Sequence, residues 1–566
     1  MRKSSGRSDD AGGTTRATKV NPMKLILGPI LYAESQTDPE TWSFSVNLLL
    51  AGEDTAKPPP LRLAFRDATG QEVGTVSGPT VAADFSGLGA PSACVFWKWA
   101  VRLPRKEAEQ RVSYRFDAIS PAFEWRMDDV KDVLVPARGA LPRCAFFSCN
   151  GMSHLKSWAT LDRPFALWEE MRRQQEEDAG FHVLIGGGDQ LYTDSLWYTN
   201  PALVRFQKLS REQRLRSSIP DGLEAELLRD YVNAYVERWN EHGIGPLLAR
   251  VPGLYTWDDH DIMDGWGSLE ELQDSPTLRA LYGAAAVAFE AFQLGALRGD
   301  VKARREPGAS HYFQATSFLG EACDLDVVLL DLRSGRTSRA LPSGKMDHLI
   351  LSEAQWQTFD HWRREHSARA AERTRPRHVL VVSSIPVVYM RFRPGVESGA
   401  SWIGKRDDLL DQWESVIHRG ERTRLMMNLF EMARDSSCSV TLLSGDAHVG
   451  SRALIRSRNV RHLHPGHAEV YIEQVTSSGI VHPPPSALEL MGMRALSHDV
   501  PEDLPGHLRT ELLPVGGDLY LRERNWVSLR VSAGQQGRSP KLWLKWEAEH
   551  SHVDVQVVVD PPARGG

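Results

Sequence analysis

Five apolar runs that each end in polar residues most constrain the fold of this 566-residue chain. The runs are PRCAFFSCNG, FHVLIGGGDQ, DLDVVLLDLRSG, RHVLVVSSIPV and SVTLLSGDAHVG. Continuous apolar runs are typical of strands buried on both faces, and helical stretches lie between them. The alternation predicts an α/β domain with a mostly parallel or mixed sheet. In such domains ligands bind beyond the carboxyl ends of the strands, where the polar residues of these runs collect.

Helical periodicity is clearest in the segment PDGLEAELLRDYVNAYVERWN. Asp221 and Glu224 stand there at the spacing of a capping box. An apolar stripe with the period of an α-helix follows. Its members are Leu223, Leu227, Leu228, Tyr231, Val232, Tyr235 and Trp239.

The pattern of the chain changes near residues 138 and 480. Short β-branched and aromatic runs separated by turn residues predict a β-rich sandwich-like domain at 22–138. The α/β part occupies 139–480, and a β-rich C-terminal extension and tail occupy 481–566. Two runs of the extension predict a hairpin that extends the α/β sheet or packs on the first domain. Residues 1–21, rich in Gly, Ser, Thr and Lys, predict a disordered tail.

Composition excludes several classes of protein. The formal net charge of −6 gives no overall field that would recruit nucleic acid, so no stable nucleic-acid partner is expected. Five scattered cysteines without a CxxC pair argue against a disulfide framework and suit a reducing compartment. No run of about 18 apolar residues predicts a membrane span, and the N-terminal residues lack the apolar region of a secretory signal. We therefore expect a cytoplasmic protein without a membrane span.

Polar residues of several chemical types follow the strand-like runs. Carboxylates dominate, joined by thiol, phenol, imidazole and guanidinium groups. They are Cys149, Asn150, Asp189, Tyr192, Asp194, Asp258, Asp259, His260, Asp261, Asp264, Asp331, Arg333, Arg336, Asp446 and His448.

Taken singly, most of these residues have an ordinary structural interpretation. Cys149, taken alone, is more typical of a small buried hydrophobic residue than of a ligand. Asp189, after three glycines, is equally suited to capping a turn. Asp331, Arg333 and Arg336 suit a structural ion pair, and Asp194 is expected only to brace its loop.

The motif DDHD at 258–261 is harder to explain without a ligand, and a solvated acidic loop is the alternative. Its three carboxylates repel one another and raise one another's pKa, and a nearby cation relieves that repulsion. Hard cations bind carboxylates, and iron also accepts thiolate and phenolate ligands. Two-metal sites hydrolyse phosphoesters by generating hydroxide and clamping the oxygens of an in-line displacement. His260, beside a candidate ligand, is placed to protonate the leaving oxygen.

The order of the motifs resembles a known family. SCNG, GGGDQLYTD, WDDHDIMDGWG, LLDLRSGRT, DQWESV and LLSGDAHVG follow one another over about 140–480. This order resembles the alkaline phosphatase D (PhoD-like) branch of the calcineurin-like metallophosphatases. The resemblance implies a four-layer α/β/β/α sandwich with two central sheets and a β-rich N-terminal domain. It also implies a metal centre at one edge and hydrolysis of a small phosphoester by metal-bound hydroxide.

The resemblance also implies a set of metal ligands. By motif position, Cys149 resembles a thiolate ligand of iron, Asp189 a bridging carboxylate and Tyr192 a phenolate ligand. Asp259 stands where the wider superfamily has the Asn of its GNH motif, a ligand of the second metal. The family resemblance implies iron with calcium, and manganese or zinc are the alternatives used elsewhere in the superfamily.

The remaining residues complete the implied site. His260 resembles the catalytic histidine, and Asp446 and His448 match the GDxH motif that closes the site. Arg333 resembles a residue that orders the site or contacts phosphate.

Two departures from the superfamily pattern leave a second function open. SCN replaces the usual D-x-H, and Ser384 stands where a ligand histidine is usual. Either the cysteine–tyrosine version of the site is complete, or the fold is catalytically degenerate and acts as a binding or scaffold module.

Overall fold

The computed structural model describes most of the chain between residues 23 and 559. The described ranges are 23–52, 57–89, 93–119, 130–159, 161–177, 179–298, 311–340, 343–372, 375–392, 411–459, 461–463, 469–497, 502–504, 507–532, 540–551 and 556–559. The predicted tail at 1–21 lies outside them.

Ten strands from three parts of the chain form the first sheet of the described ranges. They are β1 (Lys24–Ala33), β2 (Thr41–Ala51), β4 (Thr75–Asp84), β5 (Cys94–Pro104), β8 (Cys144–Phe147), β9 (Val183–Gly187), β10 (Gly253–Thr256), β22 (Asn525–Val531), β23 (Leu542–Ala548) and β24 (Gln556–Val559). Their order is β24-β23-β22-β8-β9-β10-β1-β2-β5-β4. Strands β8, β9 and β10 run parallel, and β10 also pairs in parallel with β1.

Nine described strands form the second sheet. They are β11 (Gln314–Phe318), β12 (Asp324–Leu329), β15 (Arg377–Ser383), β16 (Cys438–Ser444), β17 (Gly450–Ser457), β18 (Val470–Thr476), β19 (Glu502–Leu504), β20 (Leu508–Leu513) and β21 (Tyr520–Leu521). Strands β12, β15, β16 and β18 run parallel at its centre. The apolar runs predicted from the sequence are therefore central strands of the two sheets.

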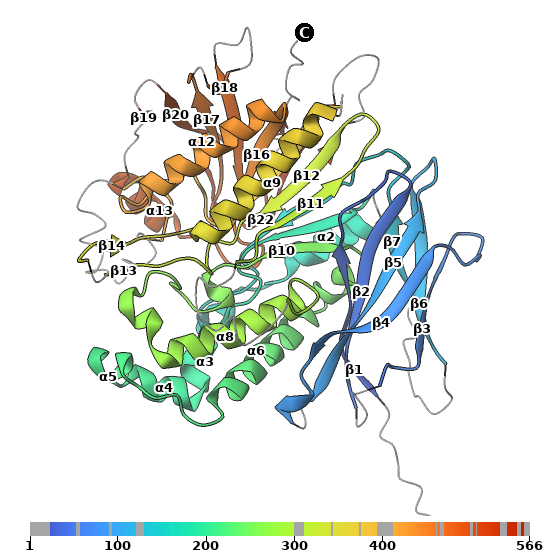
Figure 1. The fold of residues 1–566 in the computed structure, drawn as a ribbon, viewed down its shortest axis with the longest axis horizontal. Coiled ribbons are helices and arrows are strands. Elements are labelled where there is room, and N and C mark those ends of the chain that lie inside the picture. The colour runs from blue at the N-terminus through green and yellow to red at the C-terminus, as the bar shows by residue number, and fades with distance from the viewer. Residues whose placement is uncertain are drawn as a thin grey trace, which may run out of the picture.

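The two sheets pack face to face, with helices on their outer faces. A core between the sheets joins Ile185 of β9 and Phe146 of β8 to Val382 of β15. Helices α2 (Ala166–Glu177), α6 (Leu223–Trp239) and α8 (Pro276–Phe292) cover the other face of the first sheet. Helices α9 (Glu353–Glu372) and α12 (Arg419–Asp435) cover the second, and Figure 1 shows this pair in yellow and orange. The result is the predicted α/β/β/α sandwich.

Smaller elements complete the described fold. Strands β3 (Leu61–Arg66), β6 (Gln110–Ala118) and β7 (Lys131–Val135) form a three-stranded sheet, and β13 (Arg339–Ala340) pairs with β14 (Met346–Asp347). The other helices are α1 (Leu155–Trp158), α3 (Leu196–Thr199), α4 (Pro201–Gln207), α5 (Arg211–Leu215), α7 (Gly245–Leu248) and α13 (Ala487–Leu496). The 3-10 turns are η1 (Ser86–Leu88), η2 (Thr193–Ser195), η3 (Asp259–Asp261) and η4 (Glu270–Asp274).

The structure refines two local predictions. The apolar stripe of α6 is buried except for the half-buried Leu228, but the helix begins at Leu223 after Gly222, whose φ is 78°. No side-chain capping bond forms there, so the predicted capping box at Asp221 and Glu224 is wrong. The predicted C-terminal hairpin forms as β22 and β23, and it extends the first sheet by pairing with β8. No helix of the described ranges is both long and apolar enough to cross a membrane.

Candidate metal centre

The candidate site lies where the central strands of both sheets end. Cys149 follows β8, Asp189 follows β9, and Asp258 to Asp261 follow β10. From the second sheet, Arg333 follows β12, Ser384 follows β15, and Asp446 follows β16. Thr256 joins the two sets of strand ends, because its hydroxyl donates a hydrogen bond to the carbonyl of Leu330 at 3.0 Å.

Four of the predicted site residues adopt a left-handed backbone conformation. The φ angles are 52° for Cys149, 55° for Asp189, 58° for Asp446 and 52° for His448. Non-glycine residues rarely occupy this region, which costs roughly 1–3 kcal/mol per residue. Such strain clusters at functional sites, where the surrounding structure holds a side chain in a required direction.

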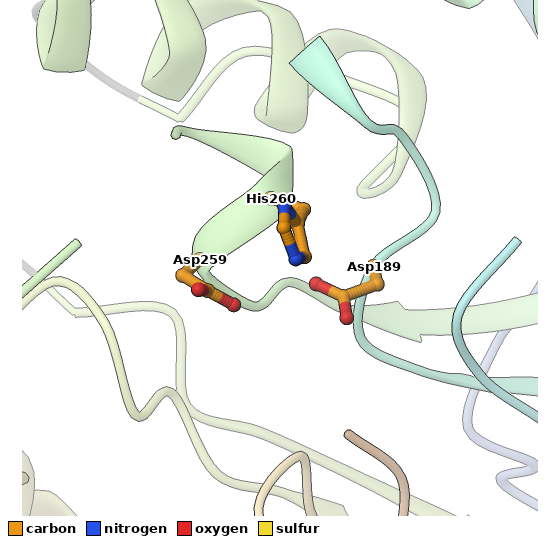
Figure 2. A group of neighbouring side chains, drawn as sticks. All are labelled: Asp189, Asp259 and His260. Carbon is orange, nitrogen blue, oxygen red and sulfur yellow. The ribbon is translucent and has the colours of Figure 1, made fainter. Parts of the chain in front are cut away.

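Carboxylates from three strand ends converge at this point. Ligand atoms of Asp189, Asp259 and His260 all lie within 4.8 Å of one another, and Figure 2 shows these side chains facing a common space. A second, overlapping group consists of Asp189, Asp258, Asp259 and Asp446. Asp258 was not assigned a role by the sequence, although it lies in the DDHD motif.

Two oxygens of this cluster are buried without a hydrogen-bond partner. They are Oδ1 of Asp189 and Oδ2 of Asp258. A buried carboxylate oxygen that lacks a partner is costly, and a bound cation would satisfy it. The carboxylate cluster therefore fits a hard metal ion on its own geometry.

The electrostatics of the cluster lead to the same conclusion. Burial, followed by the negative charges of Asp258 and Asp259, raises the pKa of Asp446 well above its usual value. Burial also raises the pKa of Asp189 well above its usual value, although nearby His260 opposes the shift. Burial raises the pKa of Asp258 to about 6. These carboxyls would ionise together only beside a compensating positive charge.

Cys149 and Tyr192 both approach Asp189. The thiol of Cys149 lies 3.6 Å from Oδ2 of Asp189, and the hydroxyl of Tyr192 lies 3.5 Å from the same atom. Burial, together with Asp189, raises the pKa of the Cys149 thiol, so this thiol carries its proton in the absence of a cation. Gly151 allows the tyrosine ring to approach, because a Cβ at that position would lie 2.4 Å from Cδ2 of Tyr192.

His260 is held by a carboxylate that the sequence had not assigned to the site. Oδ2 of Asp194 lies 2.8 Å from Nδ1 of His260, and Oδ1 accepts the amide N–H of Asp264 at 3.1 Å. Burial lowers the pKa of His260, but Asp194 and Asp259 outweigh burial and raise it well above its usual value. The ring of Tyr192 stacks on that of His260 with centroids 4.2 Å apart. Asp194 thus orients the histidine in addition to bracing its loop.

Arg333 lies fully buried beneath the carboxylates. Its guanidinium contacts Asp258, Asp259 at 3.2 Å and Asp411 at 2.7 Å. Burial raises the pKa of Asp259, but Arg333 and His260 outweigh burial and lower it below its usual value. Asp331, the ion-pair partner suggested by the sequence, instead accepts the Trp257 indole N–H at 2.8 Å. The sequence missed Asp411, because 78 residues separate it from Arg333.

Ser384 stands where the family resemblance leads us to expect a ligand histidine. Its hydroxyl donates a hydrogen bond to Oδ1 of Asp258 at 2.9 Å, and its side chain is fully buried. Asp446 also has a polar neighbour, because the amide of Gln412 donates to its Oδ2 at 3.0 Å.

His448 lies in a stack of rings next to the carboxylate cluster. Its ring packs on that of His482 with centroids 3.6 Å apart and an interplanar angle of 12°. Neither of the two carboxylate groups found among the described residues includes His448 or Cys149. His482, which the sequence had not singled out, is a further residue of this region.

One family of known proteins matches part of this chain. The family described as PhoD related phosphatase matches residues 145–345. Over these residues the chain is similar to the PhoD-related phosphatases. The matched segment carries Cys149, Asp189, Tyr192, Asp259, His260 and Arg333.

Solved structures extend the likeness beyond the PhoD-related segment. The structure of PhoD aligns with 95% of this chain and 92% of its own, with a TM-score of 0.50 and 12% identity. The two proteins therefore share an overall fold. A purple acid phosphatase, PPD1 from yellow lupin (Lupinus luteus) seeds, aligns with 95% of this chain and 74% of its own, with a TM-score of 0.47 and 10% identity.

A curated relative is also similar in sequence. The uncharacterized protein YGR266W of Saccharomyces cerevisiae is 22% identical over 419 residues. The match covers 65% of this chain, which spans 57% of the length of that relative. Other residues of the candidate centre lie outside the PhoD-related segment. They are Asp411, Asp446, His448 and His482.

Proposed function

We propose that the chain is a metal-dependent phosphoesterase that hydrolyses phosphomonoesters, phosphodiesters or both. The observation that carries the proposal is the cluster of four strand-end aspartates, two of which hold a buried oxygen without a hydrogen-bond partner. The similarity of residues 145–345 to the PhoD-related phosphatases supports the same reaction class.

The proposed metal-binding residues are Cys149, Asp189, Tyr192, Asp259, Asp446 and His448. Asp189 contacts both the thiol and the phenol, which supports its assignment as the carboxylate shared between two cations. Bound cations would supply a nucleophile at neutral pH and neutralise charge on the phosphoryl oxygens. Iron with calcium is the proposed pair by family resemblance, and manganese or zinc is the alternative.

His260 is the proposed acid that protonates the leaving oxygen. Hydrogen bonding to Asp194 through Nδ1 fixes its ring and favours the protonated form. Arg333 is proposed to order the site, and its three carboxylate partners support that role over direct contact with phosphate. The five unpaired, buried cysteines support a reducing compartment, so the proposed substrate is a small phosphoester of the cytoplasm.

The alternative is a degenerate fold that acts as a binding or scaffold module. Ser384 favours it, because a hydroxyl replaces an imidazole at this position. Elemental analysis of the purified protein, with its visible spectrum, separates the two. Near-stoichiometric iron with a thiolate or phenolate charge-transfer band supports the iron centre, and bound manganese or zinc supports a hydrolase with other metals. Protein that stays metal-free after incubation with each metal supports the scaffold.

Two substitutions test the hydrolase directly. Asp189→Asn removes the central carboxylate and is expected to abolish metal retention together with phosphoesterase activity. His260→Ala is expected to retain metal but to lose about 10²–10⁴-fold in kcat, the usual contribution of a general acid. His361→Ala and Asp435→Asn are matched controls on exposed side chains. Full activity in both Asp189→Asn and His260→Ala would exclude the proposed function.

A further inference from the structure

Four aromatic rings form a continuous stack beside the carboxylate cluster. The ring of Tyr192 stacks with that of His260 and with that of His482, with centroid separations of 4.2 Å and 5.8 Å. His482 then packs on His448 at 3.6 Å. The interplanar angles are 22°, 22° and 12°. His482 thus stacks with two of the proposed metal ligands, Tyr192 and His448.

The backbone around His482 is tied to a third proposed ligand. The amide N–H of His482 donates to the carbonyl of Cys149 at 3.1 Å, and that of Val481 donates to the same oxygen at 3.3 Å. The amide N–H of Ile480 donates to the carbonyl of Ser148 at 3.0 Å. Cys149 itself has a left-handed backbone, so these hydrogen bonds hold a strained residue in place.

The geometry of the stack indicates that His482 supports neighbouring ligands. It does not suit binding of one ion by both His482 and His448. Nδ1 of His482 lies 2.8 Å from the carbonyl of Pro483, and a carbonyl only accepts, so Nδ1 carries the proton. An ion bound by an imidazole nitrogen lies close to the plane of that ring. Because the two rings are nearly parallel at 3.6 Å, one ion cannot lie in both planes.

We propose that His482 is a positioning residue of the candidate metal centre. Its ring packs on Tyr192 and His448 and fixes their positions, and its backbone amide holds Cys149. The segment 479–482, far outside the matched family segment, would thereby pre-orient three ligands from three different loops. This inference rests on the proposed function, because it assumes that these three residues bind metal.

Metal affinity provides the first test. Metal-stripped wild-type protein, His482→Ala and His482→Phe are titrated with Co²⁺ and followed by absorbance and calorimetry. His482→Ala is expected to bind Co²⁺ about 10-fold more weakly, the usual cost of removing a residue that orients a ligand. His482→Phe keeps a flat ring and is expected to restore most of the affinity. If His482→Phe loses as much as His482→Ala, the imidazole nitrogen acts directly and the positioning role is wrong.

A matched pair of glycine variants tests the segment without changing His482. A Cβ at Gly479 would lie 2.7 Å from Cβ and 2.6 Å from the carbonyl oxygen of His482, so Gly479→Ala displaces it. A Cβ at Gly492, in α13, would meet nothing within 4 Å. Gly479→Ala is expected to weaken Co²⁺ binding as His482→Ala does, and Gly492→Ala is expected to leave it unchanged. Equal affinities in the two glycine variants would overturn the proposal.

A readout that needs no metal separates this proposal from the proposed function. All five cysteines are buried, so alkylation followed by mass spectrometry compares Cys149 with the other four in one sample. In metal-free His482→Ala and Gly479→Ala, Cys149 is expected to react faster while the other four are unchanged, and thermal unfolding confirms the fold. An unchanged Cys149 rate in both variants would show that His482 holds nothing in place. A wild-type protein without phosphoesterase activity would refute the proposed function and leave this comparison decisive.

Discussion

At the scale of single residues, the candidate centre depends on side chains that the backbone holds under strain. Cys149, Asp189, Asp446 and His448 all have φ angles near 55°, which glycine would adopt at lower cost. The strained conformation turns each side chain sharply after a buried strand. We infer that the packing of the sheets offsets the free-energy cost of this local strain.

Asp194→Asn tests the link between carboxylate and histidine. The variant keeps an oxygen that can accept the Asp264 amide, but it removes the negative charge that favours protonated His260. We expect kcat to fall by about 10²-fold with little change in KM. The loss should be larger for alkyl phosphates than for p-nitrophenyl phosphate, because a poor leaving group needs the proton more. Steady-state kinetics on both substrates measures the difference.

A control and a contrary result complete this test. Asp221→Asn, on an exposed side chain, should leave both substrates unaffected. Equal losses on the two substrates would mean that His260 does not protonate the leaving group.

The sequence predicted some residues of the centre and missed others for a physical reason. Cys149, Asp189 and Asp446 directly follow apolar runs, so strand periodicity alone places them at one edge of the sheets. Asp194 and Asp411 were missed as contacts because their partners, His260 and Arg333, lie 66 and 78 residues away. His482 follows an isolated β-bridge between Gly479 and Ser148, and no local sequence pattern predicts that bridge.

At the scale of elements, a partly exposed polar link joins β6 to the strands of the α/β part. Arg143, before β8, forms two hydrogen bonds with Glu109, before β6, at 2.8 Å and 3.0 Å. His182, before β9, contacts the same carboxylate at 2.9 Å through Nε2, while its Nδ1 accepts the Arg143 amide. Burial raises the pKa of Glu109, but the hydrogen bonds from His182 and Arg143 outweigh it and lower that pKa to about 2.

Glu109→Gln is therefore expected to destabilise the fold by roughly 1 kcal/mol, because the carboxylate is partly exposed and its ion pair is partly screened. The folded pKa lies below the unfolded value, so the stabilisation is complete above about pH 5 and is lost as the pH falls towards 2. Urea unfolding of wild type and variant between pH 7 and pH 3 measures this. A difference that grows as the pH falls would contradict the assignment.

Element boundaries and pairings were less predictable than element types. Buried strands such as β9 and β16 are recognisable because both of their faces are apolar. The start of α6 was not recognisable from the sequence, because the N-cap is Gly222 and no side chain caps the helix. The pairing of β22 with β8 depends on contacts across more than 300 residues, which no local periodicity encodes.

At the scale of the whole molecule, the four-layer sandwich brings buried acids from both sheets to one edge. In the metal-free protein the raised pKa values of Asp189 and Asp446 oppose ionisation. Each contributes stability that is complete below its unfolded pKa of about 4 and is lost as the pH rises through its folded pKa. Metal-free protein should therefore lose stability with rising pH, and bound metal should reverse that loss.

Thermal unfolding with and without metal checks this expectation. A cation at 100 times its Kd should stabilise the wild-type fold by about 2.7 kcal/mol. Asp189→Asn should be more stable than wild type in chelator and should gain nothing from added metal, because it removes a buried charge and a ligand together. Identical responses of the two proteins to metal would place the cation elsewhere.

The first sheet has one more consequence, which concerns synthesis on the ribosome. Strand β8, which leads into Cys149, is flanked by β9 on one side and by β22 on the other. At 5–20 residues per second, roughly 20–75 s separate the emergence of β8 from that of β22. During that interval the nascent chain carries the carboxylate loops while one edge of β8 stays open. The part of the centre that contains Cys149 therefore reaches its final structure last, after the hairpin of β22 and β23 has paired with β8.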